Sequence, residues 1–352
     1  MKCEVGEPVT IVAASRGDLK SMGVWVGIDV GAKHVDMVYR HAGRASKAER
    51  YEQTPQGHRL LVKRLRGLEP ERVVLEATGI YYLDLAVALA DAGLSLSVIN
   101  PKSSRHFAEL KLQSSKTDPI DAALLAEYGE RMTPQLWTAP DTVRLSLRSV
   151  GRQINRLIGA RTQAKNRLHA LQATRGTLSL LIEDEQEGID LLDRRIERLR
   201  RAAEEILESA PELLRMKQHM SAAKGVADAT ALALLAELCV LPQHLKSGQV
   251  SRHAGLDVRL YQSGSSVNRP ARISKAGNAY IRAALYMPVM SAVRHDPNAR
   301  AFYEALVGRG KKKMQAQCAV MRKYLTGLWA CIQTDTPFDS SRLFSDCHMQ
   351  KA

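Results

Sequence analysis

The hydrophobic positions between residues 24 and 53 follow patterns that are typical of strands. "VWVGIDV" from Val24 is an almost continuous apolar run that only Gly27 interrupts, and "HVDMVYR" alternates apolar and polar residues. A buried strand gives the first pattern and a half-buried strand gives the second. The polar run that continues to Gln53 is long enough to complete a three-strand meander.

The alternation of strands and helices continues to about residue 131. Leu60, Leu61 and Leu65 after Pro55 predict a helix, and "RVVLEA" predicts a strand. "YYLDLAVALADAG" then predicts a helix, and "LSVIN" predicts a strand that a further helix follows. A meander followed by alternating strands and helices predicts a mixed sheet with helices on its faces, which is the layout of an α/β RNase H-like domain.

The next region, from about residue 142 to residue 209, has helical periodicity. Apolar residues recur with a heptad rhythm in two segments, separated by "TRGT". This pattern predicts an antiparallel helical hairpin, and a dimerising coiled coil stays open as a further interpretation. The last third is again mostly helical, with a loop after Tyr261.

These patterns divide the chain into five segments. We expect an N-terminal extension (1–23), an α/β catalytic domain (24–135), a helical hairpin or coiled coil (136–215), a mostly α-helical C-terminal domain (216–342) and a tail (343–352).

The composition indicates a polyanionic partner. The chain has 51 Lys and Arg against 37 Asp and Glu, for a formal net charge of +14. Nucleic acid is the usual partner of such a chain, and an anionic membrane surface is the competing interpretation. No apolar run reaches the roughly 18 residues of a membrane span, and the N-terminus lacks a secretory pattern. The five cysteines are scattered without a C-x-x-C pair. We therefore expect a cytoplasmic protein without a membrane partner, and oxygen ligands for any metal.

Four acidic residues stand at positions that suit metal binding. Asp29 lies within the first apolar strand, Glu76 ends "RVVLE", and Asp118 and Asp121 are three residues apart at a helix start in "KTDPIDA". Such a helix places both of its carboxylates on one face, and strand ends of this kind of sheet meet at a crevice. A cluster of hard oxygen donors suits Mg²⁺ and would repel itself without a cation.

Each of these acids also has a structural interpretation. Asp29 could cap a neighbouring element or form a local ion pair. Asp118 before Pro119 has the pattern of a helix N-cap, and Asp121 lies near the positive end of the same helix. Together with the predicted strand order, the four acids favour the metal site.

Basic residues form two candidate nucleic-acid surfaces. One is a row that recurs every four residues along the first long helix, and such a row suits a phosphate backbone. Pairing of this row with the acidic second helix, which carries Glu183 to Asp190, is an equally good interpretation. The second surface surrounds the loop after Tyr261. The two sets are Arg144, Arg148, Arg152 and Arg156, and then Arg252, Arg259, Arg269, Arg272, Lys275 and Arg282.

Several motifs resemble a known family. "GIDV", "LEATG" and "KTDPIDA" resemble the DEDD motifs of the RuvC-like domain in the IS110 family of insertion-sequence transposases. "HAGLDVR", "YQSGSSVNRPARISKAGNAYIRAALYMP" and "FDS" resemble the C-terminal domain of that family. The resemblance runs from about Val24 to Arg342, is specific at both ends, and holds only by general character in the helical middle.

The resemblance implies the chemistry. Members of the family are recombinases in which a serine of the S-G-S-S loop attacks a DNA phosphodiester and becomes covalently bound to the DNA. By motif position Ser263 corresponds to this nucleophile, with Ser265 and Ser266 as supporting hydroxyls or turn residues, although the residues by themselves do not rank the three. Two Mg²⁺ ions per active site, held by Asp29, Glu76, Asp118 and Asp121, are implied in the same way.

The resemblance also implies partners. Donor and target double-stranded DNA are the expected substrates, and a structured non-coding bridge RNA is expected to pair with both. A homo-oligomer, a tetramer formed as a dimer of dimers with composite sites, and a nucleoid-associated place in the bacterial cytoplasm complete the expectation.

Three other functions remain open at this point. A site-specific DNA invertase would use the same chemistry. A hydrolytic RuvC-like junction nuclease would leave Ser263 dispensable. An RNA-binding structural protein with a degenerate nuclease domain is the third, and the presence of all four acids argues against it.

Overall fold

The computed structural model describes residues 23–77, 81–113, 117–263 and 267–344, apart from the side chains of residues 263 and 267–270. The chain divides into two compact units, residues 1–139 and 140–352. The predicted extension, except for Gly23, and most of the predicted tail lie outside the described residues.

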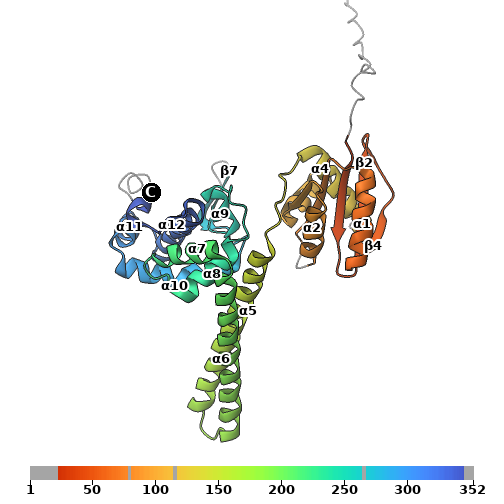
Figure 1. The fold of residues 1–352 in the computed structure, drawn as a ribbon. Coiled ribbons are helices and arrows are strands. Elements are labelled where there is room, and N and C mark those ends of the chain that lie inside the picture. The colour runs from red at the N-terminus through yellow and green to blue at the C-terminus, as the bar shows by residue number, and fades with distance from the viewer. Residues whose placement is uncertain (1–22, 78–80, 114–116, 264–266, 345–352) are drawn as a thin grey trace, which may run out of the picture. The chain divides into compact units, whose positions relative to one another are not determined.

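The first unit contains the predicted mixed sheet (Figure 1). Its order is β3-β2-β1-β5-β6, with β4 paired to β2. Strand β2 is antiparallel to β1, whereas β5 is parallel to β1 and β6 is parallel to β5. The predicted third strand is divided into two short strands, β3 and β4, which both pair with β2. The strands are β1 (Trp25–Val30), β2 (His34–His41), β3 (Arg44–Ala45), β4 (Glu49–Glu52), β5 (Arg72–Glu76) and β6 (Leu96–Ile99).

Helices cover both faces of this sheet. On one face, Leu61 of α1 (Pro55–Leu68) and Leu85 of α2 (Tyr82–Asp91) share a buried cluster with Val26 and Ile28 of β1. On the other face, Leu125 of α4 packs on Val74 and Ile99. Helix α4 (Asp118–Met132) is joined there by α3 (Pro101–Leu110), through an edge-to-face contact of Phe107 with Tyr128.

Two long helices begin the second unit. Helix α5 (Thr142–Ala173) and helix α6 (Ser179–Glu208) pack along one another (Figure 1), and Gly176 in the connecting turn has a φ of +77°. Burial of Ile154, Leu157, Ile189 and Ile196 follows the apolar rhythm of the sequence. Coiled-coil pairing with a second copy stays a prediction.

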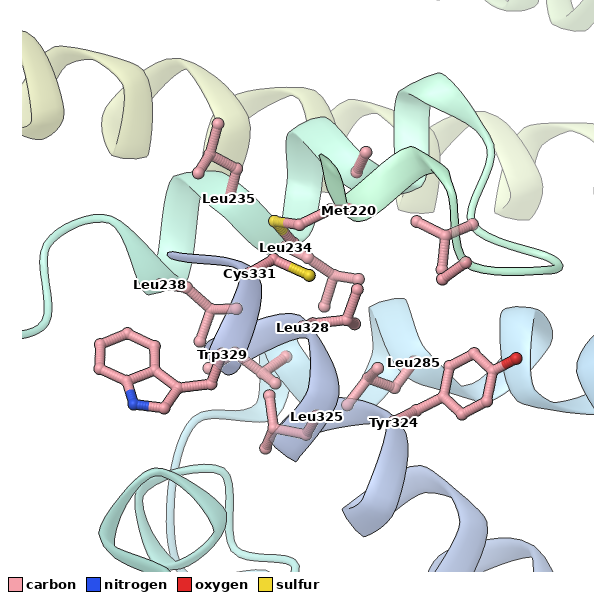
Figure 2. Packing of buried hydrophobic residues seen from close by; sticks show 14 of the residues in the cluster. Met220, Leu234, Leu235, Leu238, Leu285, Tyr324, Leu325, Leu328, Trp329 and Cys331 are labelled. Atoms are coloured by element: carbon pink, nitrogen blue, oxygen red, sulfur yellow. The ribbon is translucent and has the colours of Figure 1, made fainter. Parts of the chain in front are cut away.

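The rest of the second unit is helical apart from one β-hairpin. Leucines of α8, Leu285 of α10 and the aromatic residues Tyr324 and Trp329 of α12 form its core (Figure 2). Both aromatic side chains are fully buried. No helix in the described part of the chain is long and apolar enough to cross a lipid bilayer. The elements are α7 (Pro211–Ser221), α8 (Asp228–Leu238), α9 (Ser247–His253), β7 (Val258–Ser263), β8 (Val267–Ile273), α10 (Ala279–His295), α11 (Pro297–Gly308), α12 (Lys313–Thr334) and α13 (Ser340–Leu343).

Candidate active site

Acidic side chains gather on the face of the sheet that α4 covers. Successive residues of a strand point to opposite faces. Val26, Ile28 and Val30 pack toward α1 and α2, so Asp29 points to the α4 face. Glu76 shares this face with Val74, two residues earlier, which packs on α4.

The position of α4 is set by Gly27. A Cβ at this glycine would lie 2.1 Å from the carbonyl oxygen of Ala122, so only glycine permits this close contact of helix and strand. Gly129 lies against Trp25, and the helix therefore runs antiparallel to β1. One helical turn advances about 5.4 Å and two strand residues advance roughly 6.6 Å. The turn before Ala122 therefore lies beside Asp29.

This arrangement brings the other three predicted acids into electrostatic range of Asp29. The pKa of Asp29 is raised from 3.8 to about 6, first by burial and then by the charges of Asp121, Asp118, Glu76 and Asp36, in that order. The shift has the sign expected for carboxylates that share a site without a cation.

Three further residues belong to this site and were not predicted. Asp36 is buried and lies directly opposite Asp29 on β2. Arg50 of β4 donates two hydrogen bonds to the Asp36 carboxylate, at 3.0 and 2.9 Å, and its Nη2 lies 3.7 Å from Asp118. The buried Ser104 donates a hydrogen bond of 2.5 Å to Glu76. The alternation in "HVDMVYR" places Asp36 on a face, but only the strand register shows its neighbours.

The donor set fits a hard divalent cation in its chemistry. Four carboxylates come from β1, β5 and the first turn of α4, and the ionised form of Asp29 is disfavoured without a cation. In the described part of the chain, no three Asp, Glu, His or Cys side chains lie close enough together to form a ready metal site. Binding therefore requires side-chain rotation, for which Asp118 has room because its side chain is 65% exposed.

The capping interpretation of Asp118 is wrong. The N-cap of α4 is Thr117, and Asp118 is the first helical residue. Its carboxylate forms an ion pair with Arg50.

The predicted arginine row is largely engaged in ion pairs. Arg144 pairs with Asp141 and Glu212, and Arg152 forms hydrogen bonds of 2.6 and 2.9 Å to Glu237. These partners lie outside α6, so the interpretation that the row pairs with the acidic second helix is wrong for these arginines. The acids of α6 pair instead with arginines farther along α5. Phosphate contacts of the row stay a prediction, and for Arg144, Arg148 and Arg152 they would compete with a carboxylate. Arg156 is exposed.

Glu237 is the centre of a buried polar cluster that the sequence did not reveal. Its side chain is 1% exposed, and it accepts hydrogen bonds from Arg152 of α5 and from Asn278, the latter at 2.6 Å. Asn278 also caps α10 by accepting from the amides of Tyr280 and Ile281. The cluster therefore joins α5, α8 and α10.

The Ser-Gly-Ser-Ser loop lies at the end of the hairpin of β7 and β8. Ser263 is the last residue of β7 and is in register with Val267, and a register shift lies between Arg259 and Tyr261. The side chain of Ser263, and Ser265 and Ser266 as a whole, lie outside the described residues.

The predicted basic residues around this hairpin differ in their surroundings. Arg252, Arg259, Arg272 and Lys275 are exposed, whereas the half-buried Arg282 donates hydrogen bonds to the carbonyl oxygens of Ala254 and Gly277. The side chain of Arg269 lies outside the described residues.

Comparison with known proteins identifies the family. A family model for DEDD transposases of the IS110 group, described as "Transposase", matches residues 26–173, and one described as "Transposase IS116/IS110/IS902 family" matches residues 217–304. The pilin gene-inverting protein of Moraxella bovis is 28% identical over 76% of this chain and 81% of its own length. The insertion element IS110 uncharacterized 43.6 kDa protein of Streptomyces coelicolor is 23% identical over 92% of this chain and 97% of its own length.

The likeness to a solved structure is weaker. The match to Thermus thermophilus RuvC in complex with a Holliday junction substrate covers 31% of this chain and 96% of the RuvC chain, at 18% identity and a TM-score of 0.25. The family assignment rests on the sequence matches, which extend over the motifs at both ends of the chain. The chain belongs to the IS110 family of transposases.

Proposed function

We propose that this transposase cuts and rejoins DNA through a covalent phosphoserine intermediate, with Ser263 as the nucleophile and a magnesium site formed by Asp29, Glu76, Asp118 and Asp121. The observation that carries the proposal is the gathering of these four acids on one face of the sheet, where burial and the charges of the other three raise the pKa of Asp29. Carboxylates that only stabilise a fold are paired with cations, as Glu237 is.

The proposed step conserves bonds and protons. The hydroxyl oxygen of Ser263 forms a bond to phosphorus, and one ester bond between phosphorus and a sugar oxygen breaks. The serine proton passes to solvent, and the departing sugar oxygen takes up a proton. The reverse attack by a sugar hydroxyl of another strand restores the serine, so that strands are rejoined without ATP.

The residues of the acidic site divide into metal ligands and positioning residues. Asp29, Glu76, Asp118 and Asp121 would hold Mg²⁺, which when bound activates the attacking oxygen and stabilises the leaving oxygen. Two neighbours would position these ligands. Ser104 donates a hydrogen bond to Glu76, and Arg50 binds the Asp36 carboxylate and pairs with Asp118.

The partners complete the proposal. Ser263 belongs to the second unit and the carboxylates to the first, so the reaction needs an assembly on DNA that joins them. A homo-oligomer, such as a dimer of dimers, guided by a bridge RNA that pairs with donor and target DNA, would supply it at the bacterial nucleoid. The net charge of +14 supports partners of this kind.

A covalent adduct tests this function. Purified protein is incubated with Mg²⁺, candidate guide RNA and end-labelled DNA, and the products are separated on a denaturing gel. We expect a labelled protein–DNA adduct that Ser263→Ala abolishes and that Ser265→Ala and Ser266→Ala retain. Loss of the adduct only in one of these two controls would relocate the nucleophile.

The acidic site has its own control in the same assay. Asp29→Asn is expected to abolish both cleavage and adduct, while binding of nucleic acid is largely retained. Cleavage of DNA without an adduct would contradict the serine mechanism and support the hydrolytic nuclease.

A site-specific invertase is the second candidate, because the pilin gene-inverting protein of Moraxella bovis is 28% identical. A plasmid that carries two copies of a recognised site in inverted orientation distinguishes the outcomes. Inversion of the intervening segment supports the invertase, and joining of the sites to a second DNA molecule supports the transposase.

A further inference from the structure

The second unit contains a large cavity at the base of the β7–β8 hairpin. Its volume is about 1310 Å³, and its walls include Val258 and Ile273 of the hairpin, Tyr286 of α10, and Met314 and Cys318 of α12. Pockets for drug-sized ligands have volumes of roughly 300–1,000 Å³, so this cavity has room for a larger ligand. It lies at the base of the hairpin, whose first strand ends at Ser263.

The charged side chains that the structure describes around the cavity all have the same sign. In this part of the chain no Asp or Glu lines it, whereas seven cations do. Among the described residues only one of them, Arg342, has a carboxylate partner, Asp339 at 3.4 Å. The other six make no ion pair in this part of the chain: Arg272, Lys275, Arg282, Lys311, Arg322 and Lys323.

These cations differ from the arginine row of α5. Arg144 and Arg152 of the row are engaged by carboxylates of the same chain. Cations that have no internal carboxylate partner and that surround a cavity form the electrostatic footprint of a polyanion.

The interior of the cavity is apolar. Leu256, Phe302, Leu306 and Met321 contribute to its lining. Tyr286, which is 38% exposed, and Met314, which is 54% exposed, offer further apolar surface. A phosphate chain alone would gain nothing from such a lining, but a nucleobase would, because bases stack on aromatic and apolar side chains.

A paired duplex presents only phosphates and the edges of its bases. A base reaches the floor of a cavity only after it has left the stack. The combination of an apolar interior with a cationic rim therefore favours a nucleic-acid strand that is unpaired at this point.

We propose that this cavity receives unpaired nucleotides of the DNA strand that Ser263 attacks, with the bases against Tyr286 and the apolar interior and the phosphates on the cationic rim. The commitment to DNA rests on the proposed function, because the cavity wall continues into the strand that carries the nucleophile. The cavity then holds the cut strand next to the serine while a new partner strand approaches.

Cys318 gives a direct test, because it lines the cavity and is only partly buried. The full-length protein is treated with N-ethylmaleimide, and the modification of each cysteine is followed by peptide mass spectrometry. We expect a short unpaired oligodeoxynucleotide to slow the reaction of Cys318 by about fivefold or more. The buried Cys331 reports that the protein stays folded.

Three other probes decide the class of ligand. Inorganic polyphosphate and a fully paired duplex of the same sequence are expected to change the reaction of Cys318 less than about twofold, because they lack a free base. Equal protection by either would overturn the base-binding proposal. Protection by RNA of the same sequence but not by DNA would make the ligand class wrong, and the absence of protection by any probe would overturn the cavity as a nucleic-acid site.

Variants separate the interior from the rim. Tyr286→Ala is expected to weaken oligodeoxynucleotide binding roughly tenfold, with little effect on polyphosphate binding. Met287→Ala is the matched control, because this neighbour is 65% exposed and does not line the cavity. Equal losses in the two variants would contradict the role of Tyr286.

At the rim, Lys311→Gln should weaken the binding of both the oligodeoxynucleotide and polyphosphate, and it should reduce the salt dependence of binding by about one charge. Arg309→Gln, at an exposed cation outside the lining, should change neither. All of these measurements need no metal and no cleavage. Protection of Cys318 without a serine adduct would support the cavity as a nucleotide-binding site and contradict the proposed function. A serine adduct without protection of Cys318 would support the proposed function and contradict the cavity as a nucleotide-binding site.

Discussion

Each of the two units of this protein contains a carboxylate removed from solvent, and the pKa values of these two carboxylates shift in opposite directions. Glu237 in the second unit is 1% exposed, yet its pKa is lowered: burial acts to raise it, but the hydrogen bonds from Arg152 and Asn278 and the charges of Arg152 and Arg148 outweigh burial. Asp29 in the first unit is only half-buried, yet burial and its acidic neighbours raise its pKa to about 6.

The comparison separates a structural carboxylate from a candidate catalytic one. Depth of burial does not decide the direction of the shift, since the more deeply buried acid has the lower pKa. At Glu237 the neighbouring cations reverse the effect of burial, whereas at Asp29 burial is the largest cause of the raised pKa and the surrounding carboxylates add to it. The first arrangement holds helices together, and the second stays unfavourable until a cation binds.

The largest effect is expected for Glu237→Ala. The change leaves Arg148, Arg152 and Asn278 without their shared acceptor, and breaking a buried pair of this kind costs about 3–5 kcal/mol of unfolding free energy. Urea denaturation followed by circular dichroism measures the loss. Glu212→Ala removes the 52%-exposed partner of Arg144 and should cost less than about 1 kcal/mol. Equal losses would show that burial of the pair is irrelevant.

A smaller loss is expected for Gly27→Ala in the first unit. The new methyl group would meet the backbone of α4 at Ala122 and Ala126, and overpacking of this kind costs about 1–3 kcal/mol. Thermal denaturation measures it. Gly67→Ala is the matched control, because its Cβ would meet nothing within 4 Å inside helix α1, and it should be neutral or stabilising.

Gly27→Ala should also move α4 and its two acids away from Asp29. The pKa of Asp29, measured by NMR titration, is therefore expected to fall toward 3.8. An unchanged pKa would mean that α4 does not set the distance between these carboxylates.

Asp29→Asn is expected to stabilise the metal-free protein. The pKa of Asp29 is higher in the folded protein than its ordinary value of 3.8, so ionisation costs stability as the pH rises from about 4 to about 6 and the full cost remains above that. The variant removes this cost. After allowance for partial exposure, we expect a gain of roughly 1 kcal/mol at pH 8 that disappears near pH 4, measured by thermal denaturation.

Magnesium provides the control for this prediction. Mg²⁺ should raise the melting temperature of the unchanged protein, because a ligand that binds only the folded state stabilises it. It should have a much smaller effect on Asp29→Asn. Equal stabilisation of both proteins would place the ion elsewhere.

The smallest effect is expected for Arg161→Gln. This arginine pairs with Asp193 across the two long helices at 2.5 Å, but the Asp193 side chain is 45% exposed. An exposed pair of this kind contributes about 0–1 kcal/mol, so denaturation should detect little change. A loss as large as that of Glu237→Ala would remove the distinction between buried and exposed pairs on which the comparison rests.

Much of the first unit could be predicted because its segments are either continuous apolar runs or alternate with the strand period. The runs around Ile28, Met37 and Leu75 gave the strands, and the meander with the following strand–helix units gave the mixed sheet. The four acids could be selected because together with the predicted strand order they pointed to one site, although each of them also had a structural interpretation.

Neighbours across elements could not be predicted in this way. The spacing of Arg144, Arg148 and Arg152 correctly places them along one helix, but it does not show that Glu237 of α8 lies beside two of them. Asp36 and Arg50 were overlooked because polar residues on an alternating strand are ordinarily solvent-exposed. Ser104 carries no signal of its own and acquires a role only through its contact with Glu76.

The sequence by itself determined the order of the elements, the faces on which their side chains lie and the family to which the motifs point, since each of these depends on local periodicity or local residue identity. Only the tertiary structure decided which charges became neighbours. Strand register set Asp36 opposite Asp29, and the contact at Gly27 set the depth at which α4 packs on the sheet. Both depend on how distant segments pack together, and the energy of a charge is decided by what lies within a few ångströms of it.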